Sequence, residues 1–328
     1  MPINLSGRPF LRLLDFSTEQ IEYLLKLSKN FKDLKRTGTP HRYLEGKNIV
    51  LLFEKTSTRT RCAFETSCHD LGLGFTYLSN SHFGNKETVK DSIRVFSEMY
   101  DAIVLRAQRE EAYVREVADI ATIPVINACC EGDHPTQMLA DLLTIREHFG
   151  HLKGIRMTYM GDARYNMGNS LMVACAKMGM HFTACTTAKY FPAKELVAEC
   201  EAIAAQTGGS ITLTEDVKAG TKDVDVIYTD VWVSMGEPDE VWTERIKELS
   251  PYQVNKAVMD NAGEQAIFMH CLPAFHDLKT KIGAQMGERF GITEMEVTDE
   301  VFESGQSLVF EEAENRMHTI KAVMAATL

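Results

Sequence analysis

The sequence has little that would attach it to a membrane or to a nucleic acid. Its apolar runs are short: nowhere do eighteen apolar residues follow one another, the length that a membrane span requires. The opening stretch MPINLSGRPFLRLLDF also lacks the uncharged apolar core of a secretory signal. A formal net charge of -11 argues against a surface for nucleic acid or anionic lipid. We therefore expect a cytoplasmic protein that holds any bound anion locally.

Several ligand-binding motifs are missing as well. The eight cysteines include no C-x-x-C pair, and the adjacent Cys129 and Cys130 would bridge each other only with strain, so we expect reduced thiols. The pattern G-x-x-x-x-G-K-[ST] is absent, which excludes a nucleoside triphosphate as the implied ligand. A dinucleotide-dependent oxidoreductase is an alternative because MGDAR (160–164) follows a predicted strand, but Gly161 has no G-x-G-x-x-G partners.

What is present is the composition of an ordinary globular protein, with 45% hydrophobic and 25% charged residues, and a length of 328 residues that suits two domains. Ser17 and Gln20 predict a capping box that opens a helix ending near Lys35. Apolar runs then alternate with amphipathic stretches. They predict strands at 48–53, 75–78, 102–105, 123–127, 155–161, 181–185, 224–230 and 266–272, and helices at 59–71, 87–99, 111–120, 134–149, 168–179, 193–206 and 313–328.

This alternation predicts an α/β protein of two doubly wound domains with mainly parallel sheets, joined by interdomain helices. We expect the domains at 1–148 and 149–310, with a final helix at 311–328 that packs back on the first domain. In such sheets, ligands bind beyond the carboxyl ends of the strands, where the strand order reverses. Polar residues just after the predicted strands are therefore the candidates for a functional site.

TSTRTR (56–61) follows the strand at 48–53 and opens a helix, so its backbone N–H groups and hydroxyls suit a phosphate. Arg59 adds a guanidinium group that can donate hydrogen bonds to two oxygens of one phosphate. The alternative is that Ser57 or Thr58 only caps the helix while Arg59 and Arg61 are solvated surface charges. The position after a buried strand favours a small phosphorylated ligand.

Two further stretches follow strands in the same half. Arg106 comes directly after AIVL, although a lone arginine there is more often an ion-pairing surface residue. HPTQ (134–137) begins a helix and places His134 and Gln137 on one face. His134 either packs against its own helix or acts as a neutral imidazole that polarises a carbonyl. No second histidine lies at metal-ligand spacing in this helix.

The second half offers DVWVSMGEP (230–238) and HCLPAF (270–275), each after a predicted strand. Asp230, Ser234 and the backbone at Met235 are suited to a cationic amine with neighbouring polar groups. Trp232 and Met235 are individually more often packing residues. Cys271 is, on its own, more often a small buried hydrophobe than a reactive group.

Taken together, STRTR, HPTQ, DVWVSMGE, HCLPAFHD and AENRMHTIKAVM resemble the transcarbamoylase family over nearly the whole chain. STRTR and HPTQ are typical of the family in general, and DVWVSMGE with HCLPAFHD is typical of its ornithine-type branch. The resemblance implies transfer of the carbamoyl group of carbamoyl phosphate to the side-chain amine of L-ornithine, which gives L-citrulline and phosphate. The reaction is reversible and serves arginine biosynthesis or arginine degradation by the deiminase pathway. Domain 1–148 would bind carbamoyl phosphate and domain 149–310 would bind ornithine.

The resemblance also implies a role for each matching residue. The phosphate ligands would be Ser57, Thr58, Arg59, Thr60 and Arg106. The carbamoyl group would be surrounded by His134, Gln137, Cys271, Leu272 through its backbone, and Arg316. Ornithine would be held by Asn166, Asp230, Ser234 and Met235. The family assembles as trimers or multiples of trimers with shared active sites, and His82, in the loop 79–87, would reach into the neighbouring subunit's site.

The implied mechanism is attack of the neutral amine on the carbamoyl carbon, without metal or cofactor. Arg106, His134 and Arg316 would donate to the developing oxyanion. Our hypothesis is that Cys271, beside Asp230 and near arginines, favours the deprotonated amine or accepts its proton. Holding both substrates between two closing domains would supply much of the remaining acceleration.

Other interpretations remain open at this point. The nearest alternative is a transcarbamoylase with another acceptor: aspartate, a diamine such as putrescine, or an acylated ornithine. An aspartate acceptor requires cationic residues in the second site, where DVWVSMGE offers carboxylates. A diamine lacks the carboxylate and the α-amino group that the Ser-Met-Gly loop is suited to bind. Besides a transcarbamoylase and the dinucleotide-dependent oxidoreductase mentioned above, a non-catalytic regulatory relative is a third class of function. Tyr165 stands where many bacterial members have asparagine, which affects the fine shape of the ornithine pocket.

Overall fold

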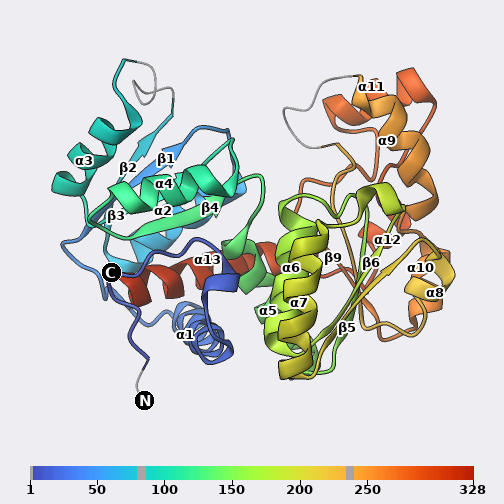
Figure 1. The fold of residues 1–328 in the computed structure, drawn as a ribbon, viewed down its shortest axis with the longest axis horizontal. Coiled ribbons are helices and arrows are strands. Elements are labelled where there is room, and N and C mark those ends of the chain that lie inside the picture. Colours follow the sequence, from blue (N-terminus) through green and yellow to red (C-terminus); the bar gives the residue numbers. More distant parts are fainter. Residues whose placement is uncertain (1–2, 80–85, 234–239) are drawn as a thin grey trace. The chain divides into compact units, whose positions relative to one another are not determined.

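The chain folds into two compact units, each built around a parallel sheet (Figure 1). Unit 1 consists of Met1–Thr144 and Ala313–Leu328, and unit 2 is the intervening Ile145–Glu312. The computed structural model describes residues 3–79, 86–233 and 240–328.

The sheet of unit 1 has the strand order β2-β1-β3-β4, with all neighbours parallel. Its strands are β1 (Asn48–Phe53), β2 (Gly74–Leu78), β3 (Ala102–Arg106) and β4 (Val125–Cys129). The apolar run of β1 is buried from Ile49 to Phe53, as expected for a strand covered on both faces. On one face, residues of β1, β3 and β4 pack with the apolar sides of α3 (Val89–Met99) and α4 (Glu111–Ile120).

Four further helices belong wholly or partly to unit 1. They are α1 (Thr18–Arg36), α2 (Arg59–Leu71), α5 (Pro135–Phe149) and α13 (Val309–Thr327), and a short 3-10 helix, η1 (Leu13–Asp15), precedes α1. The predicted capping box is confirmed: the Ser17 side chain accepts from the backbone N–H of Gln20, and the Gln20 side chain accepts from that of Ser17.

The sheet of unit 2 has the strand order β7-β6-β5-β8-β9, again all parallel. Its strands are β5 (Arg156–Met160), β6 (His181–Cys185), β7 (Ser210–Thr214), β8 (Val226–Thr229) and β9 (Ile267–His270). The helices are α6 (Asn166–Met178), α7 (Lys194–Thr207), α8 (Val217–Gly220), α9 (Val241–Leu249), α10 (Lys256–Ala262), α11 (Lys281–Phe290) and α12 (Asp299–Phe302), with 3-10 helices η2 (Ala188–Tyr190) and η3 (Ser250–Tyr252).

The core of unit 2 joins the sheet to helices that the sequence did not predict. Met160, Ile227 and Phe268 from three strands share one buried cluster with Trp242 of α9 and Val258 of α10. The expectation of α/β units with parallel sheets is confirmed, because each sheet is parallel and flanked by helices.

Within residues 3–79, 86–233 and 240–328, none of the helices combines enough length with enough apolar character to cross a bilayer.

Candidate active site

In unit 1 the strand order reverses between β1 and β3, which are neighbours although β2 lies between them in the sequence. α2 begins at Arg59, shortly after β1, and Arg106 is the last residue of β3. Because the strands are parallel, these residues lie at the same edge of the sheet, where α/β proteins bind ligands. The edge therefore carries two of the arginines that the sequence singled out.

Thr60, which is only 1% exposed, is the point on which the arginines converge. Arg316 of α13 places Nη2 2.9 Å from Thr60 Oγ1, and Arg106 places Nη1 3.5 Å from the same oxygen. The first distance is that of a good hydrogen bond and the second that of a weak one. Segments far apart in the sequence thus bring two buried guanidinium groups to one hydroxyl.

His134 lies immediately before α5 and is 7% exposed. Burial lowers its pKa well below the usual value, and the positive charges of Arg316, Arg106 and Arg59 lower it further. The imidazole is therefore neutral at physiological pH, and it adds no charge to the arginines around it. A neutral imidazole beside three guanidinium groups suits a ligand that has an anionic end and a carbonyl group.

The remaining predicted residues of unit 1 differ in exposure. Thr58 is the N-cap of α2 but makes no side-chain cap hydrogen bond, and it is exposed, whereas Ser57 and Arg59 are half-buried. Gln137 is buried and donates through Nε2 to Asp141 Oδ1 at 2.8 Å. Arg61 is exposed, as expected if it is a solvated surface charge. It pairs with Glu65 at 2.7 Å and lies over the ring of Tyr77.

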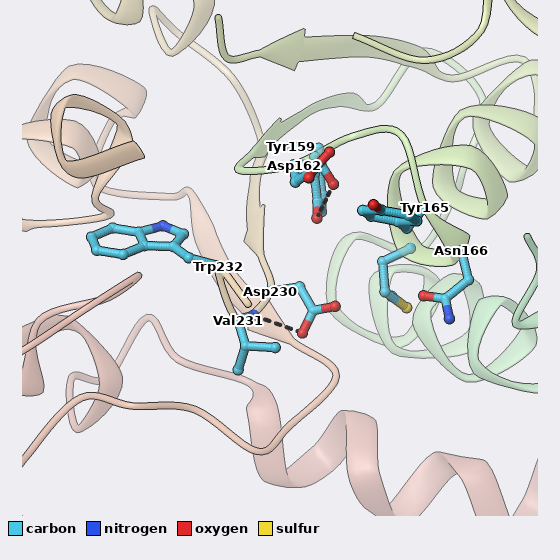
Figure 2. A pocket seen from close by; sticks show the side chains of 8 residues that line it. Tyr159, Asp162, Tyr165, Asn166, Asp230, Val231 and Trp232 are labelled. Atoms are coloured by element: carbon cyan, nitrogen blue, oxygen red, sulfur yellow. Dashed lines mark hydrogen bonds between the residues drawn. The ribbon is translucent and has the colours of Figure 1, made fainter. Parts of the chain in front are cut away.

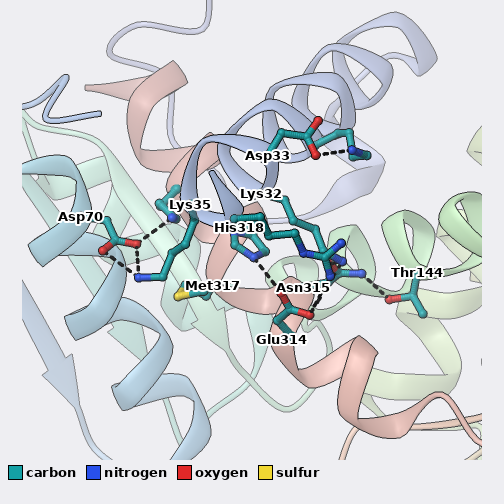
Figure 3. Close-up of polar contacts among 12 residues, drawn as sticks. Lys32, Asp33, Lys35, Asp70, Thr144, Glu314, Asn315, Met317 and His318 are labelled. Carbon is teal, nitrogen blue, oxygen red and sulfur yellow. Dashed lines mark hydrogen bonds and ion pairs between the residues drawn. The ribbon is translucent and has the colours of Figure 1, made fainter. Parts of the chain in front are cut away.

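Buried polar contacts hold α13, which carries Arg316, against α1 and α2 (Figure 3). Lys32 of α1 donates to Asn315 Oδ1 at 2.7 Å, next to Arg316 in the sequence. The fully buried Lys321 pairs with Asp70 of α2 at 2.7 Å. One turn earlier on α2, Ser67 donates to the backbone oxygen of Met317 at 2.9 Å. The face that α13 presents to Thr60 is therefore set by contacts with two other helices.

In unit 2 the strand order reverses between β5 and β8, and a pocket opens beyond the carboxyl ends of these strands (Figure 2). The side chains that line it come from the end of β5 and the loop after it, the start of α6 and the loop after β8. They are Tyr159, Asp162, Tyr165, Asn166, Met167, Asp230, Val231 and Trp232. Asn166 and Asp230, both predicted from the sequence, therefore lie in one pocket.

Asp230 is held in this pocket by neutral donors. Its Oδ1 accepts from the backbone N–H of Val231 at 2.8 Å and from Cys271 Sγ at 3.3 Å. Burial raises the pKa of Asp230 above its ordinary value, while the neighbouring His270 and these hydrogen bonds oppose the rise. Asp230 and Cys271 are thus in direct contact, as the proton-transfer hypothesis requires.

The turn after β9 is fixed by two buried carboxylates. Glu312 accepts from the backbone N–H of His270 at 3.0 Å, and Glu296 Oε1 lies 3.4 Å from His270 Nε2. His270 Nδ1 in turn accepts from the backbone N–H of Leu272 at 2.9 Å. Leu272 has a positive φ of 57°, which is uncommon outside glycine and is typical of functional sites.

Asp162, its partner Arg245 and the buried Tyr159 are pocket features that sequence reasoning missed. Asp162 follows β5 within MGDAR, a stretch whose glycine is its most distinctive feature in the sequence. Arg245 lies in α9, pairs with Asp162 and is 5% exposed. No motif marks Arg245; only its burial in the folded chain distinguishes it from a surface arginine.

Gly168 explains how α6 can start so close to the pocket. A Cβ atom at this position would lie 2.5 Å from both the Cα and the carbonyl oxygen of Ala163, which is too close for any side chain. The absence of a side chain therefore lets the first turn of α6, with Asn166, pack directly on the loop that carries Asp162.

Two groups of described residues place potential metal ligands within 4.8 Å of one another: Asp230, His270 and Cys271, and His276, Asp299 and Glu303. In the first group, His270 Nδ1 already accepts a backbone N–H and Cys271 contacts Asp230. His82, Ser234 and Met235, which the sequence singled out, lie outside the described residues.

Family models match both halves of the chain. Residues 8–147 match the carbamoyl-P binding domain of aspartate/ornithine carbamoyltransferase, and residues 153–327 match its Asp/Orn binding domain. A Treponema denticola protein named catabolic ornithine carbamoyltransferase is 65% identical over 327 residues, which cover 99% of this chain and 96% of the relative. A Staphylococcus aureus ornithine carbamoyltransferase is 54% identical over 329 residues, which cover 99% and 98%.

A solved structure supports the same relationship. The ornithine carbamoyltransferase from Pyrococcus furiosus matches with a TM-score of 0.90 and 40% identity, over 99% of this chain and 98% of that one. Family models and relatives thus agree over almost the entire length. The chain belongs to the aspartate/ornithine carbamoyltransferase family.

Proposed function

We propose that this protein is an ornithine carbamoyltransferase, which transfers the carbamoyl group of carbamoyl phosphate to the side-chain amine of L-ornithine and yields L-citrulline and phosphate. The observation that carries the proposal is the convergence of Arg106 and Arg316 on the buried Thr60, beside a neutral His134. The names of the Treponema denticola and Staphylococcus aureus relatives support the choice of ornithine.

The groups of unit 1 match the demands of the donor substrate. Loss of phosphate builds negative charge on the leaving group, and the fixed charges of Arg59 and Arg106 neutralise it without reorganising water. The N-terminus of α2, with Ser57, Thr58 and Thr60, adds N–H and hydroxyl donors. Arg106, His134 and Arg316 donate to the oxyanion that forms at the carbamoyl carbon. Gln137 and the Leu272 backbone contact the carbamoyl group.

The pocket of unit 2 suits the amino-acid end of ornithine. Asp230 supplies a carboxylate for the α-ammonium group, and Asn166 lies at the start of α6, where partial positive charge favours the α-carboxylate. Ser234 and Met235 remain part of this proposed set. An aspartate acceptor fits poorly, because its second carboxylate would face Asp230.

We expect Cys271→Ala to slow turnover about a hundredfold, the contribution typical of a general base. If Cys271 takes up the proton of the attacking amine, the variant depends on solution to deprotonate it, so its optimum moves to higher pH. Initial rates across pH measure this shift. Cys62→Ala removes an exposed thiol and is the control that should keep the wild-type profile. An unchanged profile in Cys271→Ala would exclude the proton-transfer role.

The proposal extends to assembly and direction. The resemblance implies a trimer or a multiple of trimers, in which His82 of one subunit completes the site of its neighbour. The reaction runs in either direction, and the Treponema denticola relative is named as a catabolic enzyme.

The test is a citrulline-forming assay with carbamoyl phosphate and, in parallel, ornithine, putrescine or aspartate. We expect turnover with ornithine and its loss in Arg59→Ala, because the side chain that grips the phosphate is removed. Arg61→Ala is the matched control two residues away, since Arg61 is exposed and paired with Glu65. Analytical ultracentrifugation of the same samples should give the mass of a trimer or a multiple.

Each result has a distinct meaning. Turnover with another acceptor would keep the phosphate site and contradict the choice of ornithine. Equal losses in Arg59→Ala and Arg61→Ala would contradict the assignment of the phosphate ligand, and no turnover with any acceptor would favour a regulatory relative.

A further inference from the structure

Two carboxylates line the pocket of unit 2, and their surroundings differ (Figure 2). The described hydrogen-bond partners of Asp230 are neutral: the backbone N–H of Val231 and the thiol of Cys271. Asp162 instead accepts hydrogen bonds from two guanidinium groups. Arg164 bonds both carboxylate oxygens, through Nε at 2.9 Å and Nη2 at 2.8 Å, and Arg245 bonds Oδ2 through Nη1.

Counting formal charges gives the two ends of the pocket opposite signs. At one end, one carboxylate, Asp162, faces two guanidinium groups, so this group of three carries a net charge of about +1. At the other end, Asp230 carries about -1. Asp162 and Arg245 are 8% and 5% exposed, so solvent screens their charges less than those of surface residues. The N-terminus of α6 lies at the positive end and adds to it.

A pocket with this polarity fits a ligand that carries both an ammonium and a carboxylate group. A diamine presents two ammonium groups and no carboxylate, and one of them would meet the positive end. We infer that Arg245 selects α-amino acids over diamines as acceptors, by outweighing the charge of Asp162 at the carboxylate-binding end of the pocket. The inference rests on the proposed function, because it concerns the choice of acceptor.

Arg245 is held by more than its ion pair. Its guanidinium lies 4.7 Å from the centroid of the Tyr190 ring, and that of Arg164 lies at the same distance. The hydroxyl of Tyr190 donates to Glu248, which pairs with the exposed Lys189 together with Glu244. These two glutamates face the more exposed side of the cluster, where solvent and Lys189 screen them. Arg245 acts on the substrate through Asp162, so it is a positioning residue.

The test compares kcat/KM for ornithine with kcat/KM for putrescine. Arg245→Met removes the charge but keeps a long side chain, and the remaining Asp162 and Arg164 sum to zero. We expect the ratio of ornithine to putrescine to fall at least tenfold, mainly through a higher KM for ornithine. Arg245→Lys keeps the charge and should retain most of the ratio. Lys256→Gln removes an exposed cation of the same unit, which pairs with the exposed Asp260, and should leave the ratio unchanged.

A double variant separates charge from structural damage. Arg245→Met combined with Asp162→Asn leaves Arg164 alone, which returns the positive end to about +1, so the ratio should recover toward the wild type. If Arg245→Met acted through structural damage, the second substitution would add further damage and the ratio would not recover. An unchanged ratio in Arg245→Met, or failure of the double variant to recover it, would overturn this inference alone. Absence of ornithine turnover by the wild type would overturn the proposed function itself.

Discussion

Replacing Arg106 with alanine is expected to lower turnover about 10²- to 10³-fold, the usual cost of removing one donor from a developing oxyanion. Arg106 is the last residue of β3, is 9% exposed and points a guanidinium nitrogen at Thr60. Its charge also lowers the pKa of His134, so the variant should let that pKa rise. Because the proposed mechanism uses the neutral imidazole, activity should then fall off at a higher pH on the acid side.

The measurement is the initial rate of citrulline formation across pH, with both substrates saturating. Arg109→Ala is the matched control, because Arg109 lies three residues on, is exposed and lies over the ring of Tyr113. Arg106→Lys should show an intermediate rate, since it keeps the charge but lacks the planar fork. A rate within a few-fold of the wild type in Arg106→Ala, with unchanged thermal stability, would contradict its assigned role.

The second large effect is expected from Asp230→Asn, which keeps the shape of the side chain but removes its charge. Loss of one partner of a buried ion pair costs about 2 to 5 kcal/mol, so kcat/KM for ornithine should fall about 30-fold or more. The KM for carbamoyl phosphate should change little, because Asp230 belongs to the acceptor pocket.

The pH dependence gives an independent check on Asp230. Burial raises its pKa, so its carboxylate is protonated at a higher pH than an ordinary aspartate as the solution is acidified. Ornithine binding should therefore weaken as pH falls through this raised pKa, and Asp230→Asn should lack that step. Ornithine KM values measured at successively lower pH, in the wild type and the variant, trace this step. The same acid step in the variant would show that another group causes it.

The elements that sequence reasoning predicted well are those whose burial is uniform. NIVLLF is buried along almost its whole length in the centre of a sheet, and its predicted bounds match β1. By contrast, β7 was missed because SITLT lies at the sheet edge, only partly buried, and alternates with polar residues. α11 was missed because its two glycines weaken the helical pattern. The fold nevertheless requires one of them, because a Cβ at Gly283 would lie 2.5 Å from a carbonyl oxygen.

The site divides in the same way. Residues that follow strands, such as Arg106 and Asp230, were found because parallel strands bring their carboxyl ends to one edge. Arg245 was not found, because its neighbours Asp162 and Tyr190 are more than fifty residues away and α9 carries no motif. Packing between elements decides which arginines are buried. The periodicity of a single helix therefore does not predict the burial of Arg245.

Unit 1 is assembled from two pieces of chain, with all of unit 2 inserted between Thr144 and Ala313. On the ribosome, the four strands of its sheet are therefore made well before Arg316, which is separated from Thr60 by 256 positions. A nascent chain can pair β1 to β4 and still lack one arginine of the anion site, because α13 emerges after the whole insert. Synthesis of the second unit thus delays completion of the charge cluster, because Arg316 is made only after that whole unit.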